Sequence, residues 1–252
     1  MDFLKKTPIY CINLLEREDR YQDSVSEFER VGLMDHVIFK RVNKSKYGGT
    51  YGCFESHMNI YKEALKKNYP YILIFEDDFI FRDDNLDKCI SRVKRVMENY
   101  PNWLKISVQN NGTIEAHRQE CGIYWGNFVH TRCYFISKRA MRRCVNKGIT
   151  QNHIDLQQLF DFQDEEVFIV RPAIMYDKVS ASDNYSNEND PIIIRKLVKL
   201  QEKTHLPALI EDRCNMYLKI FTKAELYFRK KVYDRHNKPF IFPNNSNNIN
   251  TL

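Results

Sequence analysis

The sequence predicts an α/β domain built on a mostly parallel sheet, and two observations lead to this fold class. Short apolar runs of strand length alternate along the chain with charged segments whose apolar residues recur every three or four positions. With 252 residues, of which 43% are hydrophobic, the chain can also bury the core that such a sheet needs. An alternation of strands and helices is typical of parallel strands connected by crossover helices.

The first half of the chain follows the order strand, helix, strand, helix, strand. Three apolar runs lie at residues 8–14, 37–42 and 71–75. Between them, residues 18–31 and 53–67 carry apolar side chains along one helical face. This order predicts a parallel sheet that binds its ligand at the carboxyl ends of the strands.

The second half continues the pattern less regularly. Residues 110–128 show neither a helical nor a strand period, and we expect them to be irregular. The expected regular elements are a helix at 86–98, strands at 104–108 and 134–136, a helix at 137–145 and a strand at 167–170.

The character of the chain changes near residue 190. We expect an α/β unit over residues 1–190, followed by a basic helical extension over residues 191–243. The Asn-rich residues 244–252 are expected to be a disordered tail. The helices of the extension are the surface through which we expect any homo-oligomer to form.

The charge balance bears on the class of ligand. Lys and Arg total 39 while Asp and Glu total 33, which gives a net charge of +6. A mildly basic chain suits an anionic ligand such as a nucleotide. A nucleic-acid-binding protein driven by the basic C-terminal helices is one alternative. Their Lys and Arg residues form no continuous stripe, however, so we expect no nucleic-acid partner.

Seven cysteines, an odd number, show no C-x-x-C spacing, which argues against a zinc ribbon or a thioredoxin motif. Residues 1–6 lack the apolar region of a signal peptide, and no apolar run is long enough to span a bilayer. We therefore expect reduced thiols and a cytoplasmic location.

Three consecutive carboxylates, Glu76, Asp77 and Asp78, follow the strand predicted at residues 71–75. Like charges packed at the edge of a core need a compensating positive charge, and a hard divalent cation shared with phosphate oxygens would supply it. Alternation along a strand places Glu76 and Asp78 on one side as metal ligands, with Asp77 free to contact a sugar or ribose. The alternative is that the acids begin a solvated loop.

Polar residues also follow two other predicted elements. Gly52 leads into a helix whose first turns carry Ser56 and His57, and helix N-termini bind anions. The alternative is an ordinary loop glycine with a structural histidine.

Asn13 and Leu14 end the first strand, and Arg17 and Arg20 follow within reach of a diphosphate. The alternative for this segment is a solvated run of charges. Asp155, in His153-Ile154-Asp155, is a candidate general base.

Together these motifs resemble glycosyltransferase family 25, the family of lipopolysaccharide-biosynthesis and collagen galactosyltransferases. The resemblance covers residues 8–183. Its matching stretches are Ile12-Asn13-Leu14 with Arg17 and Arg20, Gly52-Cys53 with Ser56-His57, residues 71–78, residues 134–140 and His153-Ile154-Asp155. The last stretch corresponds to the family's Pro-x-Asp segment but lacks its proline.

The resemblance implies a GT-A-like, Rossmann-type nucleotide-sugar fold. It further implies a UDP-sugar donor, Mn²⁺ or Mg²⁺ as cofactor, and inverting transfer of a hexose, with galactose or glucose favoured, to a glycan or protein hydroxyl. Asp155 is then the base, with Asp177 and Asp183 as rivals. Glu76 and Asp78 hold the metal, and the nucleotide sugar is bound by Asn13, Leu14, Arg17, Arg20, Gly52, Ser56, His57 and Asp77.

A nucleotide-sugar-binding module without catalysis is a further alternative, because the proline before Asp155 is missing. The sequence names neither the sugar nor the acceptor.

Overall fold

The structure is a computed structural model that describes residues 1–109, 113–128, 130–162, 166–178, 227 and 229–240. It is organised around one mixed sheet in the order β2-β1-β3-β8-β5-β9-β7-β6. The strands are β1 (Ile9–Leu14), β2 (Val37–Val42), β3 (Tyr71–Glu76), β5 (Lys105–Ser107), β6 (Thr113–Glu120), β7 (Ile123–Phe128), β8 (Cys133–Ser137) and β9 (Val167–Val170).

Most strands of this sheet run in one direction, which confirms the predicted fold class. β1 lies between β2 and β3 and is parallel to both. Only β8 and β7 run against the other strands, since β8 pairs antiparallel with β3 and β5, and β7 with β9 and β6. The first three strands therefore end at the same edge, as expected for crossover connections.

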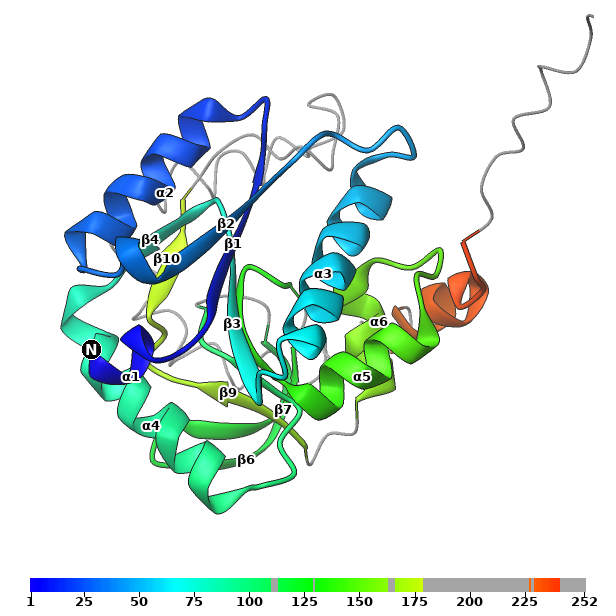
Figure 1. Cartoon of the computed structure of the whole chain (residues 1–252). Helices are drawn as coiled ribbons and strands as arrows, with labels where there is room; N and C mark the ends of the chain where they lie inside the picture. Colours follow the sequence, from blue (N-terminus) through cyan, green and yellow to red (C-terminus); the bar gives the residue numbers. More distant parts are fainter. Residues whose placement is uncertain (110–112, 129, 163–165, 179–226, 228, 241–252) are drawn as a thin grey trace, which may run out of the picture.

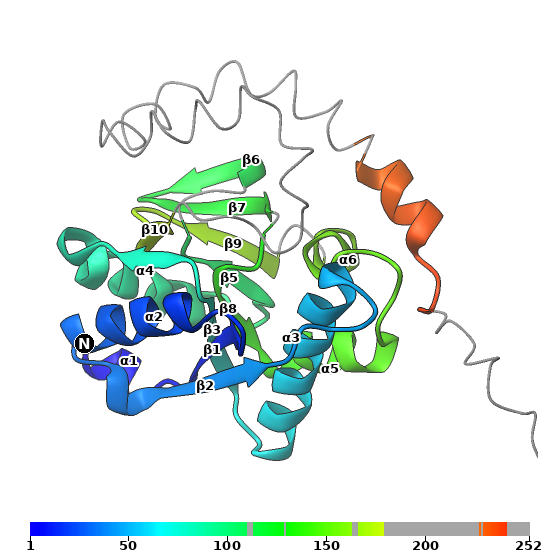
Figure 2. The ribbon, with the colours of Figure 1, turned by 90° about the horizontal axis from the view of Figure 1, so that it is seen from above.

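Helices cover both faces of the sheet (Figures 1 and 2). α1 (Asp2–Lys5), α2 (Glu18–Arg30) and α4 (Leu86–Asn99) lie on one face, whereas α3 (Gly49–Lys66), α5 (Lys138–Lys147) and α6 (Ile154–Asp161) lie on the other. Each face has its own apolar core. In β3, Leu73 and Phe75 join one core while Ile72 and Ile74 join the other, as the period of two in a strand requires.

The chain leaves β3 through the acidic motif and enters β4 (Phe79–Phe81). β4 pairs antiparallel with β10 (Met175–Asp177) in a separate two-stranded sheet. Two short 3₁₀ turns, η1 (Met34–His36) and η2 (Asp83–Asn85), precede β2 and α4. Glu76, Asp77 and Asp78 are thus held between two sheets rather than in a solvated loop.

The expectation that residues 110–128 are irregular is wrong. They contain the β6–β7 hairpin, which extends the sheet because β7 pairs with β9, with Trp125 opposite Phe168. The turn is formed by Cys121 and Gly122, both at positive φ, which suits a tight hairpin. The polar composition of β6 and its irregular register hide the period of two that would reveal these strands.

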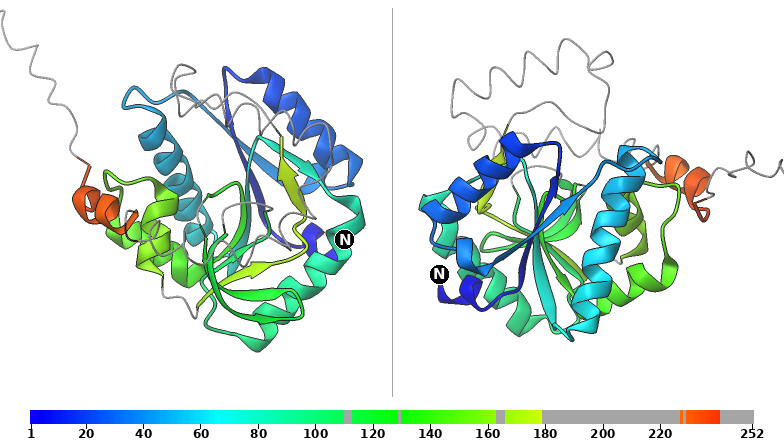
Figure 3. Two further views of the ribbon diagram at one scale, coloured as in Figure 1. Left: turned by 180° about the vertical axis from the view of Figure 1, so that it is seen from behind. Right: turned by 45° about the horizontal axis from the view of Figure 1, so that its top comes forward.

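Residues 229–236 are helical and lie beside α6 in both views (Figures 1 and 3). Tyr233 packs there against Leu156 and Leu159. Most of the predicted extension at 191–243, its oligomer surface and the tail at 244–252 lie outside the described residues. Within the described part, no helix combines the length and the apolar character needed to cross a bilayer.

Candidate functional site

The sheet brings the first and third predicted motifs together at one edge. β1 and β3 are parallel neighbours with Ile12 opposite Glu76, so the residues after Ile12 lie beside the acidic motif. Asn13 Nδ2 donates a hydrogen bond of 2.6 Å to Asp77 Oδ2. Two segments more than sixty residues apart in sequence therefore form one buried polar contact.

Asp77 is held by α2 as well as by β1. Arg20 Nη1 lies 3.1 Å from Asp77 Oδ1, and the two side chains are 10% and 9% exposed. Burial raises the pKa of Asp77, although the Arg20 guanidinium and the Asn13 amide act to lower it. Both carboxylate oxygens of Asp77 thus have protein partners, and this carboxylate joins α2, β1 and β3.

The side chains of Arg17 and Arg20 form ion pairs with different carboxylates. Arg17 precedes α2 as its N-cap residue, and its Nε and Nη2 each lie 2.9 Å from a carboxylate oxygen of Asp19. Its side chain is 19% exposed. Leu14, the last residue of β1, is half-buried. Arg17 therefore lies nearer the surface than Arg20.

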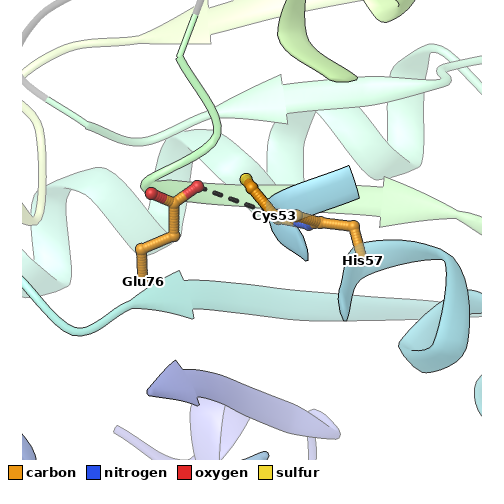
Figure 4. A group of neighbouring side chains, drawn as sticks. All are labelled: Cys53, His57 and Glu76. Atoms are coloured by element: carbon orange, nitrogen blue, oxygen red, sulfur yellow. Dashed lines mark hydrogen bonds and ion pairs between the residues drawn. The ribbon is translucent and has the colours of Figure 1, made fainter. Parts of the chain in front are cut away.

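Glu76 points toward α3 rather than toward Arg20. Its Oε1 accepts a hydrogen bond of 2.6 Å from Thr131 Oγ1 and lies 3.4 Å from His57 Nε2. Cys53 lies one turn before His57 on the same face of α3, and one ligand atom each of Cys53, His57 and Glu76 lies within 4.8 Å of the others (Figure 4). Glu76 and Asp77 thus have different surroundings, but β3 ends at Glu76, and Asp77 is held by Asn13 and Arg20 rather than free to contact a sugar.

His57 is fully buried and is held by a chain of hydrogen bonds. Its Nδ1 lies 2.8 Å from Tyr134 Oη, which lies 2.5 Å from Tyr61 Oη. Gln158 Nε2 donates to Tyr61 Oη over 2.7 Å. The chain connects α3, β8 and α6 and fixes the plane of the imidazole.

Helix α3 begins earlier than the sequence suggested, which corrects the expected position of Gly52, Ser56 and His57. Gly48, at φ 95°, is the N-cap, so Gly52 already donates its N–H to the Gly48 carbonyl. Ser56 Oγ donates to the Gly52 carbonyl at 2.7 Å. A Cβ at Gly52 would lie 2.9 Å from Ser45 Cβ, so the glycine serves close packing here.

Asp78 and Asp155 lie on the Cys53 side of the acidic motif. Asp78 Oδ2 is 3.7 Å from Arg132 Nε. Burial is the main cause of a raised pKa at Cys53, and Glu76, Asp155 and Asp78 add to it in that order. Three carboxylates from two distant segments therefore lie near enough to Cys53 to act on its thiol electrostatically.

Asp155 lies in the first turn of α6, which the sequence analysis did not predict as a helix. Its Oδ1 accepts from the Leu156 N–H at 2.7 Å and its Oδ2 from the His130 N–H at 3.1 Å. Of the rival bases, Asp177 is described only as a backbone position in β10, and Asp183 lies outside the described residues.

The model of glycosyltransferase family 25 (LPS biosynthesis protein) matches residues 33–156, which include α3, the acidic motif and Asp155. Over these residues the chain is similar to glycosyltransferase family 25. This confirms the family and the enzyme class that the sequence motifs predicted.

Relatives of this chain carry names from glycan biosynthesis. It is 22% identical to the lipooligosaccharide biosynthesis protein lic2B of Haemophilus influenzae over 84% of this chain and 85% of the relative. It is 23% identical to the lacto-N-neotetraose biosynthesis glycosyltransferase LgtE of Neisseria gonorrhoeae, over 66% of this chain and 63% of that protein. A solved glycosyltransferase involved in glycosylation of the PBCV-1 major capsid aligns over 69% of this chain and 94% of its own, with a TM-score of 0.46 and 10% identity.

The divalent ion expected of family 25 fits the oxygen donors of this edge. Glu76 and Asp78 are 24% and 18% exposed at the end of β3, whereas Asp77 is turned to Arg20. Although burial acts to raise the pKa of Glu76, hydrogen bonds from His57 and Thr131 keep it below its usual range. Glu76 therefore offers ionised oxygen atoms, as a hard cation requires of its ligands.

Sequence reasoning missed Lys105. Its side chain is buried, and its Nζ has no hydrogen-bond partner within the described ranges. The Nζ lies 4.1 Å from the ring centroid of Phe128 and 4.6 Å from that of Tyr134. Burial lowers the pKa of Lys105 to about 7, although the nearby carboxylate of Asp155 acts to raise it. A single lysine in an apolar run gives no sign of such burial.

Proposed function

We propose that this chain transfers a hexose, galactose or glucose, from a UDP-sugar to a hydroxyl group of a glycan or protein acceptor, with inversion at the anomeric carbon. The observation that carries the proposal is that the consecutive residues 130–132 contact Asp155, Glu76 and Asp78 in turn, so the three carboxylates gather at the carboxyl end of β3. The relatives named for lipooligosaccharide and lacto-N-neotetraose biosynthesis support a glycan acceptor.

Glu76 and Asp78 would hold the divalent ion, Mn²⁺ or Mg²⁺, with Asp78 as the first choice for direct contact. When bound, this ion neutralises the diphosphate and makes it a better leaving group. Asp77, Asn13 and Arg20 would line the part of the site that binds the nucleotide. Leu14 and the more exposed Arg17 would lie beside them. The N-terminus of α3, which begins at Gly49 three residues before Gly52, adds a site for an anion.

Asp155 is the proposed base for the acceptor hydroxyl. Both of its oxygens already accept a backbone N–H, yet a carboxylate has about four lone-pair sites, so each oxygen can accept a second hydrogen bond. In an inverting transfer the hydroxyl becomes acidic as its bond to the sugar forms, and the carboxylate takes the proton at that moment.

The test is UDP release from a panel of UDP-sugars by the full chain. We expect EDTA to abolish release and Mn²⁺ to restore it. Asp78→Asn should lose turnover, whereas Asp87→Asn, which alters a carboxylate that is 92% exposed on α4, should keep it. Full turnover in excess EDTA, or an Asp78→Asn enzyme with unchanged rate, would contradict the proposal.

Binding without transfer is the second candidate function. It is favoured by the two backbone hydrogen bonds of Asp155, which join the first turn of α6 to His130 and suit a structural carboxylate as well as a base. UDP-sugar binding in calorimetry without UDP release or sugar transfer, in the presence of Mn²⁺, would support this alternative.

A further inference from the structure

We infer that Cys53, His57 and Glu76 form a binding site for a borderline-soft transition-metal ion of the Zn²⁺ type. This inference goes beyond the proposed function, because it concerns a sulfur and nitrogen site rather than the oxygen ligands of the donor's metal ion. Glu76 is the one residue that the two proposals share.

The donor set has the chemistry of zinc. Thiolate, imidazole and carboxylate are the three ligand types that Zn²⁺ takes in proteins, whereas Mg²⁺ and Mn²⁺ prefer oxygen alone. Cys53 and His57 are four residues apart on α3, the spacing that places two ligands on one helical face. Glu76 approaches from the end of β3, so a helix and a strand fix the three groups (Figure 4).

The distances agree with a partly formed tetrahedral site. Ligand atoms about 2.0 to 2.3 Å from a zinc ion lie about 3.3 to 3.8 Å from one another. His57 Nε2 and Glu76 Oε1 are already 3.4 Å apart. All three ligand atoms lie within 4.8 Å of one another, so the group must contract by about 1 Å to hold an ion.

His57 is held in the way that metal-binding histidines are held. Such a histidine usually donates its second ring N–H to a fixed acceptor, which sets its orientation. Here Nδ1 faces Tyr134 Oη at 2.8 Å, and the chain continues through Tyr61 to Gln158. The Oε1 atom of Gln158 is buried without a hydrogen-bond partner in the described part. If this amide rotates by 180°, its oxygen can accept a hydrogen bond from Tyr61 Oη. Tyr61 can then accept from Tyr134, and Tyr134 from the Nδ1–H of a metal-bound His57.

The surrounding charge also favours a cation. Glu76, Asp155 and Asp78 all act electrostatically on the Cys53 sulfur. Cys53 and Glu76 are half-buried rather than fully buried, so the site lies near solvent, which would supply a fourth ligand. A site with three protein ligands and an open position is typical of zinc that binds a further ligand.

The experiment uses the full chain freed of metal with a chelator and titrated with Co²⁺, which replaces Zn²⁺ and reports on its ligands. We expect a near-ultraviolet thiolate-to-cobalt absorption band that Zn²⁺ removes by displacement. Cys53→Ser should abolish the band, and Cys121→Ser, which alters an exposed cysteine, should retain it. A wild-type protein without the band, or a Cys53→Ser protein that keeps it, would overturn the inference.

Further variants test the other ligands and the hydrogen-bond chain. Glu76→Gln keeps the side-chain volume and should weaken Co²⁺ binding, while Tyr134→Phe should weaken it about tenfold or more. Asp78→Asn should retain the thiolate band even if it loses glycosyl transfer, so failure of this inference and of the proposed function are distinguishable. Unchanged Co²⁺ affinity in both Glu76→Gln and Tyr134→Phe would overturn the site, even if Cys53→Ser does not fold.

Discussion

Arg20 and Asp77 form a buried ion pair that joins α2 to the carboxyl end of β3. The Nη1–Oδ1 distance is 3.1 Å, and the second oxygen of Asp77 accepts from Asn13. Breaking such a pair from one side leaves a buried charge without compensation, which costs more than the pair contributes. The pair therefore holds the acidic motif in place whether or not a donor is bound.

Arg20→Ala should lower the free energy of unfolding by about 3 to 5 kcal/mol, since Asp77 is left buried and charged. Arg17→Ala is the matched control, because its partner Asp19 is an exposed neighbour, and it should cost less than about 1 kcal/mol. Urea unfolding of the two variants checks this. Equal stability of Arg20→Ala and wild type would contradict the structural role.

Donor binding is a separate expectation for the same two arginines. If either touches the diphosphate, its truncation should weaken UDP binding by about 1.5 to 3 kcal/mol, the range for hydrogen bonds to charged groups. Calorimetry on folded protein measures this. Unaltered UDP affinity in both alanine variants would remove Arg17 and Arg20 from the donor site.

Asp155→Asn should lower kcat far more than donor affinity, because a base is needed mainly in the transition state. The variant also leaves one of the two backbone N–H groups, of His130 or Leu156, without a carboxylate acceptor, which costs about 1 to 3 kcal/mol. Melting temperature and kcat are measured on the same protein. A destabilised but fully active variant would refute the base and direct attention to Asp177 and Asp183.

Lys105→Met should stabilise the protein most at low pH. Between pH 7 and 10.5 the unfolded lysine binds more protons than the folded one, so wild-type stability rises with pH by at most about 1.4 kcal/mol per pH unit. The variant lacks this rise, and its advantage over wild type should therefore be largest at or below pH 7 and shrink toward pH 9. Lys88→Met, at an exposed position, should show no such trend in urea unfolding. A constant difference would show that Lys105 keeps its ordinary pKa.

Tyr233→Ala should release the helix at 229–236 from α6. Tyr233 Oη lies 2.5 Å from Asp161 Oδ1 and 2.8 Å from Lys147 Nζ, and its ring is buried. Losing a large aromatic side chain from such a contact costs about 3 kcal/mol. Hydrogen exchange should become faster at residues 229–236 and stay slow in β3. Tyr227→Ala, at a 58% exposed site, is the control and should leave exchange unchanged.

Local signals sufficed for the parts of the fold that repeat a simple period. The sequence pattern predicts β1, β3 and α2 directly. Burial on both faces of a strand gives a continuous apolar run, and burial on one face of a helix gives apolar residues every three or four positions. The β6–β7 hairpin does not, since its strands are stabilised by pairing with β9, more than forty residues away.

By itself, the sequence determined the α/β fold class, the order of strands up to β3 and the placement of Glu76, Asp77 and Asp78 at the ligand-binding edge. These follow from residue type and local spacing. Tertiary structure alone decided the partners of these acids: Arg20 for Asp77, and Cys53 with His57 for Glu76. It also decided the burial of Lys105. The physical reason is that a side chain's partner depends on which distant elements pack beside it, and no local period records that packing.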